Sequence, residues 1–356
     1  MARSGAGLRG CPGYRQPGRE GILMANTSYL EAGHRALREE MQRDERVWAL
    51  GEDLGRGGVF GQYRGLQDTF GDERIVDTPI SEACIMGAAV GAAMTDTRPV
   101  VEMRFSDFAL CAVDELVNQA AKARFMFGGQ MRVPLVVREP IGIWRSSAAQ
   151  HSQSLEAWYA HIPGLVVVAP STPADNLGLL KSAIRCDDPV VYMEHKNLWG
   201  FEGEVPEDEH LVPLGKAEIA RAGRDVTLVT WSAMRHASLE TAEELAARGI
   251  EVEVIDLRTL WPWDRDTVLA SVERTGRLLV AQEAVSVAGF GAEIAATVAE
   301  TLHDRLEAPV RRLGAPRIPV AYAPPLEDRV RVSKDEIVEA VVGMTRTSPS
   351  RVPAGQ

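Results

Sequence analysis

The chain has few of the features that mark membrane, extracellular or nucleic-acid-binding proteins. Its 356 residues include four cysteines, which form neither a Cys-x-x-Cys pair nor zinc-ligand spacing. No apolar run approaches the roughly 18 residues that a membrane-spanning helix needs, the longest being residues 83–94. Basic residues number 39 against 50 acidic ones, a net charge of -11. This balance argues against a nucleic-acid or anionic-membrane partner.

What is present is typical of a globular protein of two domains. Hydrophobic residues make up 45% and charged residues 25% of the chain, whose length exceeds that of one usual domain. We interpret Cys11, Cys84, Cys111 and Cys186 as reduced thiols and predict a cytoplasmic protein.

Strand and helix patterns alternate twice along the chain, which predicts an α/β fold with two largely parallel sheets flanked by helices. Residues 24–199 form the first domain and residues 214–345 a smaller second one, joined by a polar linker over residues 200–213. Residues 1–23, with arginines among glycines and prolines, are predicted to be a disordered leader, and residues 346–356 a disordered tail.

Two segments carry chemistry-bearing residues. Glu82 ends the run Asp77–Glu82 at a predicted strand-to-helix turn, where free N–H groups stabilise a carboxylate. An ordinary first-turn Glu that caps its helix explains this run equally well. The second segment, residues 149–154, holds His151 among Ala, Gln and Ser on a predicted loop, which is unlike a core histidine.

These two segments are among the features by which the chain resembles a known family, the β subunits of the E1 component of 2-oxoacid dehydrogenase complexes. The family includes the pyruvate, branched-chain 2-oxoacid and acetoin dehydrogenases. The resemblance runs from about Asn26 to Val342. Its landmarks are Leu50–Asp53, Val76–Glu82, Gly128–Gln130, Ala149–Gln153, Pro163–Leu165, Asp188–Val190 and Val254–Thr259. The family implies a pyrimidine-binding domain and a transketolase C-terminal-type domain.

The resemblance also implies cofactors and partners. Thiamine diphosphate lies between an α and a β subunit of an α2β2 assembly, with magnesium and the diphosphate held by the α chain. The enzyme decarboxylates a 2-oxoacid and acylates the lipoyl arm of an E2 acyltransferase. The second domain mediates dimerisation and E2 docking.

The family's site residues carry over onto five positions around this cofactor. Glu82 matches the carboxylate that bonds to pyrimidine N1′ and favours the tautomer whose amino group deprotonates the thiazolium. Phe108 matches the aromatic residue on the pyrimidine ring, with Ile80 beside it, although core packing is the commoner role of a lone Phe. His151 matches the histidine that projects toward the substrate adduct. Glu52 matches a carboxylate near the cofactor, with a solvated turn residue as the alternative.

The family further implies a potassium ion bound by backbone carbonyls. Carbonyl ligands leave almost no trace in side chains, so an ordinary strand and helix end would look the same. The matching positions are Leu135, Ala183, Ile184, Cys186 and Asp188.

The chain departs from the family in two places. Trp144 and Arg145 stand in a stretch that is glycine-rich in relatives, and Arg104, close to the cofactor, replaces Met or Gln. We hypothesise that Arg104 or Arg145 meets the carboxylate of an unusual oxoacid. Residues 194–196 and 307–328 resemble the acetoin branch more than the pyruvate branch.

Two other classes compete with this interpretation. A self-sufficient transketolase-like enzyme needs a Gly-Asp-Gly motif followed by Asn-Asn, and Gly71-Asp72 is followed by Glu instead. A non-catalytic partner protein that keeps the fold is the second, and the joint retention of Glu82, Phe108 and His151 argues against it.

Overall fold

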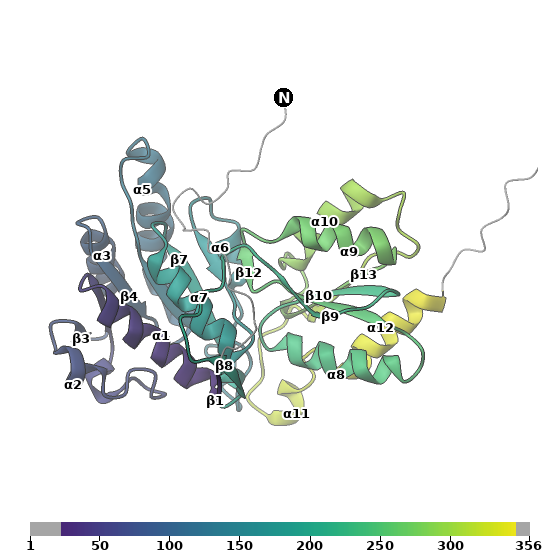
Figure 1. The fold of residues 1–356 in the computed structure, drawn as a ribbon, viewed down its shortest axis with the longest axis horizontal. Coiled ribbons are helices and arrows are strands. Elements are labelled where there is room, and N and C mark those ends of the chain that lie inside the picture. Colours follow the sequence, from purple (N-terminus) through teal and green to yellow (C-terminus); the bar gives the residue numbers. More distant parts are fainter. Residues whose placement is uncertain (1–22, 347–356) are drawn as a thin grey trace, which may run out of the picture. The chain divides into compact units, whose positions relative to one another are not determined.

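The computed structural model describes residues 23–346, which form two compact units (Figure 1). The first comprises the chain up to Lys216 together with Arg258–Pro262, and the second comprises Ala217–Leu257 and the chain from Trp263 onward. The predicted leader lies outside the described residues apart from Leu23, and so does the predicted tail apart from Arg346. No helix within residues 23–346 combines the length and apolarity required to cross a membrane.

The first unit is built on a sheet of seven strands in the order β12-β6-β7-β5-β4-β2-β3. All neighbours are parallel except β12 and β6. The strands are β2 (Val47–Gly51), β3 (Ile75–Asp77), β4 (Arg98–Glu102), β5 (Val136–Ile141), β6 (Val166–Val168), β7 (Val190–His195) and β12 (Thr259–Trp261). Their near-continuous apolar character is that of a parallel sheet buried on both faces.

Two long helices, α1 (Tyr29–Arg43) and α7 (Pro173–Arg185), contribute to the main core of this unit together with the sheet strands. Ser28 caps the first of these helices, since its hydroxyl accepts from the Glu31 N–H at 3.2 Å. Helix α7 begins with Pro173 after its cap Thr172, whose hydroxyl accepts from Asp175 N at 3.1 Å.

Shorter elements complete the first unit. Residues 108–127 form a succession of short helical pieces rather than one long helix, and one of the pieces is the π-helix η3. The pieces and remaining helices are η1 (Leu54–Arg56), α2 (Leu66–Phe70), α3 (Glu82–Ala93), α4 (Ser106–Ala109), η2 (Leu110–Ala112), η3 (Asp114–Ala120), α5 (Ala121–Met126), α6 (Glu156–Ala160) and η4 (Lys196–Leu198).

The segment predicted as a linker contains a strand. β8 (Glu202–Pro206) pairs antiparallel with β1 (Met24–Ser28), and Val205 is fully buried in the main core. The alternation that marks a strand is weak here, so pairing with a distant segment decides the structure.

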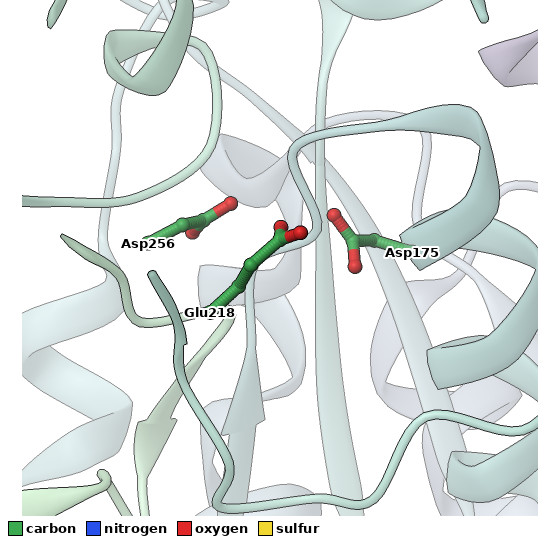
Figure 2. A group of neighbouring side chains, drawn as sticks. All are labelled: Asp175, Glu218 and Asp256. Carbon is green, nitrogen blue, oxygen red and sulfur yellow. The ribbon is translucent and has the colours of Figure 1, made fainter. Parts of the chain in front are cut away.

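The second unit has a sheet of five strands in the order β14-β13-β10-β11-β9, parallel except at the β9 edge. At that edge Glu218 pairs with Asp256, and both carboxylates are drawn in Figure 2. The Arg235 guanidinium lies 3.5 Å from Glu218 and 3.3 Å from Asp256, which compensates their negative charge. The elements are β9 (Glu218–Arg221), β10 (Val226–Thr230), α8 (Met234–Ala246), β11 (Val252–Asp256), α9 (Arg265–Thr275), β13 (Leu278–Val285), α10 (Gly291–Leu302), β14 (Arg311–Ala315), α11 (Pro324–Glu327) and α12 (Lys334–Arg346).

Candidate active site

The predicted site residues follow the carboxyl ends of neighbouring parallel strands. Glu52 follows β2, Glu82 lies shortly after β3, and Arg104 and Phe108 follow β4. His151 comes after the loop that leaves β5. This edge is where ligands bind in open parallel sheets, because the turns after the strands leave room there for side chains.

Glu82 is the first residue of α3, after Ser81. Its side chain is half-buried and makes no hydrogen bond or ion pair within the described residues 23–346. No side chain caps this helix, so its first N–H groups and their positive partial charge remain beside the carboxylate. An ionisable group in this setting is available to a ligand rather than committed to the fold.

A second carboxylate lies close to the first. Burial raises the pKa of the Glu52 carboxyl, the Arg104 charge counteracts this, and the negative charge of Glu82 raises that pKa further. The Arg104 Nε atom lies 2.8 Å from Glu52 Oε2 without hydrogen-bond alignment, and its Nη2 donates to Asp53. Arg104 is therefore neutralised by the two residues that follow β2.

His151 lies among aromatic rings. Its ring centre is 4.6 Å from that of Phe105 and 5.1 Å from that of Phe108, in an edge-on arrangement with the latter. The buried Lys196 donates to the His151 carbonyl at 2.5 Å, and its ammonium lies 4.9 Å from the Phe105 ring centre. The imidazole itself has no hydrogen-bond partner among the described residues.

The loop that carries His151 has a strained backbone. Arg145, Ser146 and Ala148 have φ values of 43°, 59° and 59°, in the left-handed region that favours glycine. Each costs about 1–3 kcal/mol and persists only where the surroundings enforce it. The Trp144 ring provides part of that enforcement, since it packs edge-on against Phe60 and Trp199 at 5.7 and 5.8 Å.

Ile80, a predicted position, and two further histidines, which were not predicted, behave differently. Ile80 is 78% exposed and so is not packed beside Phe108 in this chain alone. His161 is exposed, while His195 is buried and its Nδ1 accepts from Asn197 N at 3.2 Å. Neither of these two histidines joins the group around His151.

Four of the five carbonyls matched to a potassium site already accept hydrogen bonds. Leu135 O accepts from Val190 N at 2.8 Å, and Ala183 O accepts from Cys186 N at 3.1 Å. The carbonyls of Ile184 and Cys186 both accept from one guanidinium nitrogen of Arg98, at 3.0 Å each. As they stand, these residues do not fit an added cation, because a cation already contacts two of them.

Sequence reasoning missed a buried charged network carried by strands β4, β5 and β7. Arg138 pairs with both oxygens of Glu194 at 2.8 and 3.0 Å, and Glu102 lies 3.8 Å from the same guanidinium. Tyr63 donates to Glu102 at 2.9 Å. Desolvation, only partly offset by Arg138, raises the pKa of Glu102 to about 7. The sequence contained one signal of this network: Glu102 ends the apolar strand β4, and Arg138 and Glu194 lie within the apolar strands β5 and β7.

The cysteines were predicted only in part. Cys84 and Cys111 are free, as predicted, and both are exposed, while Cys11 lies outside the described residues. Cys186 is disulfide-bonded, so the prediction of a reduced thiol is wrong there. Spacing along the chain does not reveal which cysteines approach closely enough in space to be bridged.

Taken together, the site offers a partnerless carboxylate, a second carboxylate of raised pKa and an imidazole held by aromatic rings. Such a set can move protons to and from a bound ring system.

Comparison with known proteins defines the family. Residues 25–200 match the family "Transketolase, pyrimidine binding domain" and residues 215–337 match "Transketolase, C-terminal domain". The chain is similar to a split-gene transketolase described as an inactive β4 tetramer, with a TM-score of 0.74 over 91% of this chain and 100% of that one, at 22% identity. At that identity the likeness concerns the fold alone.

Sequence relatives are considerably closer. The chain is 47% identical over 316 residues to an acetoin:2,6-dichlorophenolindophenol oxidoreductase subunit beta of Cupriavidus necator, covering 86% of this chain and 93% of the relative. It is 43% identical to 2-oxoisovalerate dehydrogenase subunit beta of Bacillus subtilis (89% and 98% covered). It is 44% identical to pyruvate dehydrogenase E1 component subunit beta of Rhizobium meliloti (90% and 70% covered).

These matches confirm both the predicted resemblance and the predicted fold class. The chain belongs to the family of E1 β subunits of 2-oxoacid dehydrogenase complexes, built from transketolase-type pyrimidine-binding and C-terminal domains.

Proposed function

We propose that this chain, with an α subunit, forms a thiamine-diphosphate-dependent E1 enzyme that oxidatively decarboxylates a 2-oxoacid and acylates the lipoyl group of an E2. The observation that carries the proposal is Glu82, a half-buried carboxylate that begins α3 without a partner in the described chain. A purely structural glutamate at this place would be expected to cap its helix or pair with a cation.

The residues present fit the pyrimidine half of the cofactor. Glu82 would bond to a ring nitrogen, and Phe108 would pack on the ring face. Ile80 is exposed in the single chain, as expected for an apolar contact that only a bound ring or a second subunit covers. When bound, thiamine diphosphate supplies a carbon nucleophile and an electron sink. Magnesium and the diphosphate belong in this proposal to the α subunit.

The side chains have distinct tasks. Glu82 holds or releases a proton at the pyrimidine nitrogen, beside Glu52, whose own pKa is raised by burial and by the charge of Glu82. His151, with both ring nitrogens unengaged in the described chain, donates a proton or steadies negative charge on the substrate. Phe105 and Lys196 orient the His151 segment.

Exposed apolar side chains of the first unit suit a protein partner. Large apolar side chains are exposed at Ile80 and at the end of α5, where Phe125 is 89% exposed, and Met126 and Phe127 follow it. Small residues of α3, including Ala83 and Gly87, are also exposed. Exposed apolar patches of this kind mark protein interfaces. We therefore assign this surface to the α subunit of an α2β2 assembly.

The proposal also covers the second unit and the location of the protein. The second unit would mediate dimerisation and E2 docking. A cytoplasmic location is supported by the free thiols of Cys84 and Cys111, and not by Cys186. Cell fractionation tests the location.

Between the two arginines considered for substrate choice, the geometry favours Arg145. Arg104 is neutralised by Glu52 and Asp53, whereas Arg145 is exposed and lies over the Trp144 ring at 5.3 Å. It makes no ion pair within residues 23–346. We propose that Arg145 sets a preference for an oxoacid with a polar or acidic side chain.

A second candidate is acetoin cleavage, favoured by the 47% identity to an acetoin-oxidising relative. Both candidates use the same Glu82 chemistry, so the substrate alone separates them. A non-catalytic partner protein is the remaining alternative.

The test is turnover by this chain co-purified with its α subunit, with thiamine diphosphate, magnesium and an artificial electron acceptor, on a panel of 2-oxoacids and acetoin. We expect activity that requires both chains and is lost in Glu82→Gln. A stable complex that binds the cofactor but turns over no compound of the panel would favour the non-catalytic alternative.

A further inference from the structure

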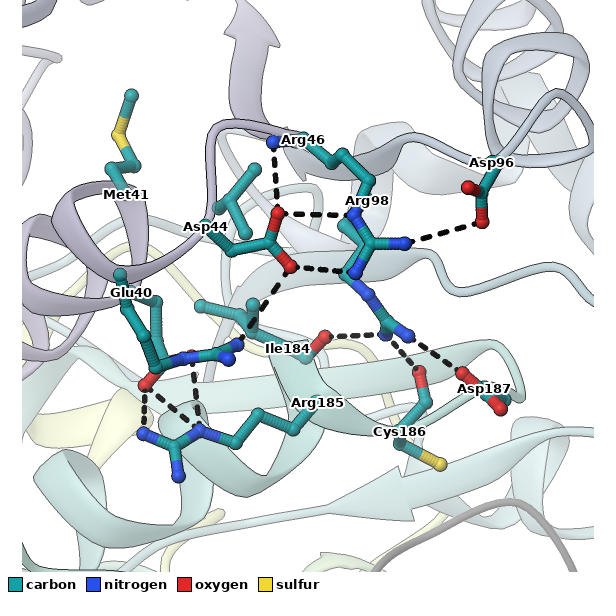
Figure 3. Close-up of polar contacts among 12 residues, drawn as sticks. Glu40, Met41, Asp44, Arg46, Asp96, Arg98, Ile184, Arg185, Cys186 and Asp187 are labelled. Atoms are coloured by element: carbon teal, nitrogen blue, oxygen red, sulfur yellow. Dashed lines mark hydrogen bonds and ion pairs between the residues drawn. The ribbon is translucent and has the colours of Figure 1, made fainter.

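Arg98, at the start of β4, reaches the carboxyl end of α7 (Figure 3). A single nitrogen of its guanidinium, Nη1, donates to the carbonyls of Ile184 and Cys186 at 3.0 Å each. The other terminal nitrogen donates to the Asp187 carboxylate at 2.7 Å. Three oxygens of one short segment therefore converge on one permanently charged group.

The segment is held in place from two other directions. Arg124 donates to the Asp188 carboxylate and, through Nη2 at 3.1 Å, to Asp187 O. Arg132 lies 3.1 Å from the second carboxylate oxygen of Asp187. The oxygens that face Arg98 are thus fixed by the fold.

The last carbonyls of a helix lack N–H partners and carry partial negative charge, so they favour a cation. The side chains of Arg98 and Asp187 are only 14% and 18% exposed, which limits screening by water. We infer that the Arg98 guanidinium serves as a built-in cation at the place where the family resemblance implies potassium, and that this chain is stable without that ion. The inference concerns stability and does not depend on the proposed reaction.

The position has no room for two positive charges. A potassium ion bound by the carbonyls of Ile184 and Cys186 would lie beside the Arg98 Nη1 atom that already bridges them. Like charges at such separation repel strongly in a partly buried setting. Removal of the Arg98 guanidinium should therefore leave the carbonyls of Ile184 and Cys186 free to bind potassium.

Thermal unfolding of the full chain tests this. Melting temperatures are compared in potassium, sodium and choline chloride at equal ionic strength. We expect the wild-type melting temperature to be equal in all three salts. Arg98→Met should melt roughly 5 °C lower in choline chloride, and potassium should recover part of that loss in a saturable manner, with sodium less effective.

Arg46→Met is the matched control, since Arg46 pairs with Asp44 and Asp96 and its side chain makes no contact with the α7 carbonyls (Figure 3). It should melt at the same temperature in potassium and in choline. If Arg98→Met does not fold, Arg98→Lys replaces it, with its ammonium expected to preserve the salt independence. A wild-type melting temperature that rises specifically with potassium would overturn the inference, as would an Arg98→Met variant indifferent to potassium.

Discussion

The Lys196 ammonium donates to the His151 carbonyl at 2.5 Å and lies 4.9 Å from the centre of the Phe105 ring, against which the His151 imidazole also packs. One buried cation thus ties the backbone of the candidate catalytic histidine to the aromatic residue that orients its ring. The relationship makes Lys196 a positioning residue.

We expect Lys196→Met to lower kcat of the reconstituted enzyme roughly tenfold, with little change in KM, because a displaced imidazole loses transition-state contacts first. Lys181→Met is the control: Lys181 is equally buried but pairs with Glu39 and Glu209. Steady-state kinetics decide the matter, and equal losses in both variants would mean that Lys196 acts only through stability.

The two arginines near the site should respond differently to substitution. Arg145→Gly should change the ratio of kcat/KM between acidic and apolar 2-oxoacids by about tenfold, since an exposed cation without an ion-pair partner among the described residues is available to a substrate carboxylate. Arg104→Met should lower kcat/KM for all oxoacids alike, because it leaves Glu52 without its cation. An unchanged preference in Arg145→Gly would refute the proposed role of Arg145.

Glu102 predicts a pH dependence of stability. Its folded-state pKa of about 7 exceeds the ordinary value of 4.5, so the folded protein binds the proton more tightly than the unfolded chain. The stabilisation is complete below pH 4.5 and is lost as the pH rises through 7. It amounts to at most about 3 kcal/mol.

Urea unfolding between pH 4.5 and pH 8 measures this effect. Glu102→Gln should have a flatter profile than the wild type, whereas the exposed control Glu204→Gln should follow the wild type. Parallel profiles for all three proteins would show that Glu102 is ionised in the folded state across this range.

Gly142 offers a steric prediction. Its φ is +91°, and a Cβ atom there would lie 2.1 Å from His195 Nε2. Gly142→Ala should lower the free energy of unfolding by about 3 kcal/mol or more and disturb the loop that leads to His151. Gly128→Ala, at φ +64° with nothing within 4 Å, should cost only about 1 kcal/mol. Chemical denaturation of both variants provides the comparison, and equal losses would rule out the clash with His195.

Local patterns predicted most of the elements because the signals lie within one element. The hydroxyls of Ser28 and Thr172 cap the helices that directly follow them, α1 and α7, and strands β10 and β11 are rich in β-branched residues. What escaped prediction depends on distant residues. Strand β8 exists because it pairs with β1, and β12 because it pairs with β6.

The candidate site shows the same division. Glu82, Phe108 and His151 could be named from the family motif, and the order of strands brings them to one edge of the sheet. The contacts of Arg98, Lys196 and Glu102 could not be predicted, since each side chain contacts a residue at least 36 positions away in the chain. Only the packing of the strands and helices brings these pairs together.

Strand β12 interrupts the sequence of the second unit yet forms an edge of the seven-stranded sheet. A truncated protein that stops at Lys216 would therefore expose the flank of β6, with its N–H and C=O groups open to pairing with other chains. During synthesis, too, this edge strand is added only after Trp261 has left the ribosome, by which time β9, β10 and β11 have already been made. Synthesis of the first unit is therefore completed only after part of the second unit has been made. A fragment intended to isolate the first unit should include residues 258–262 as well as the chain up to Lys216.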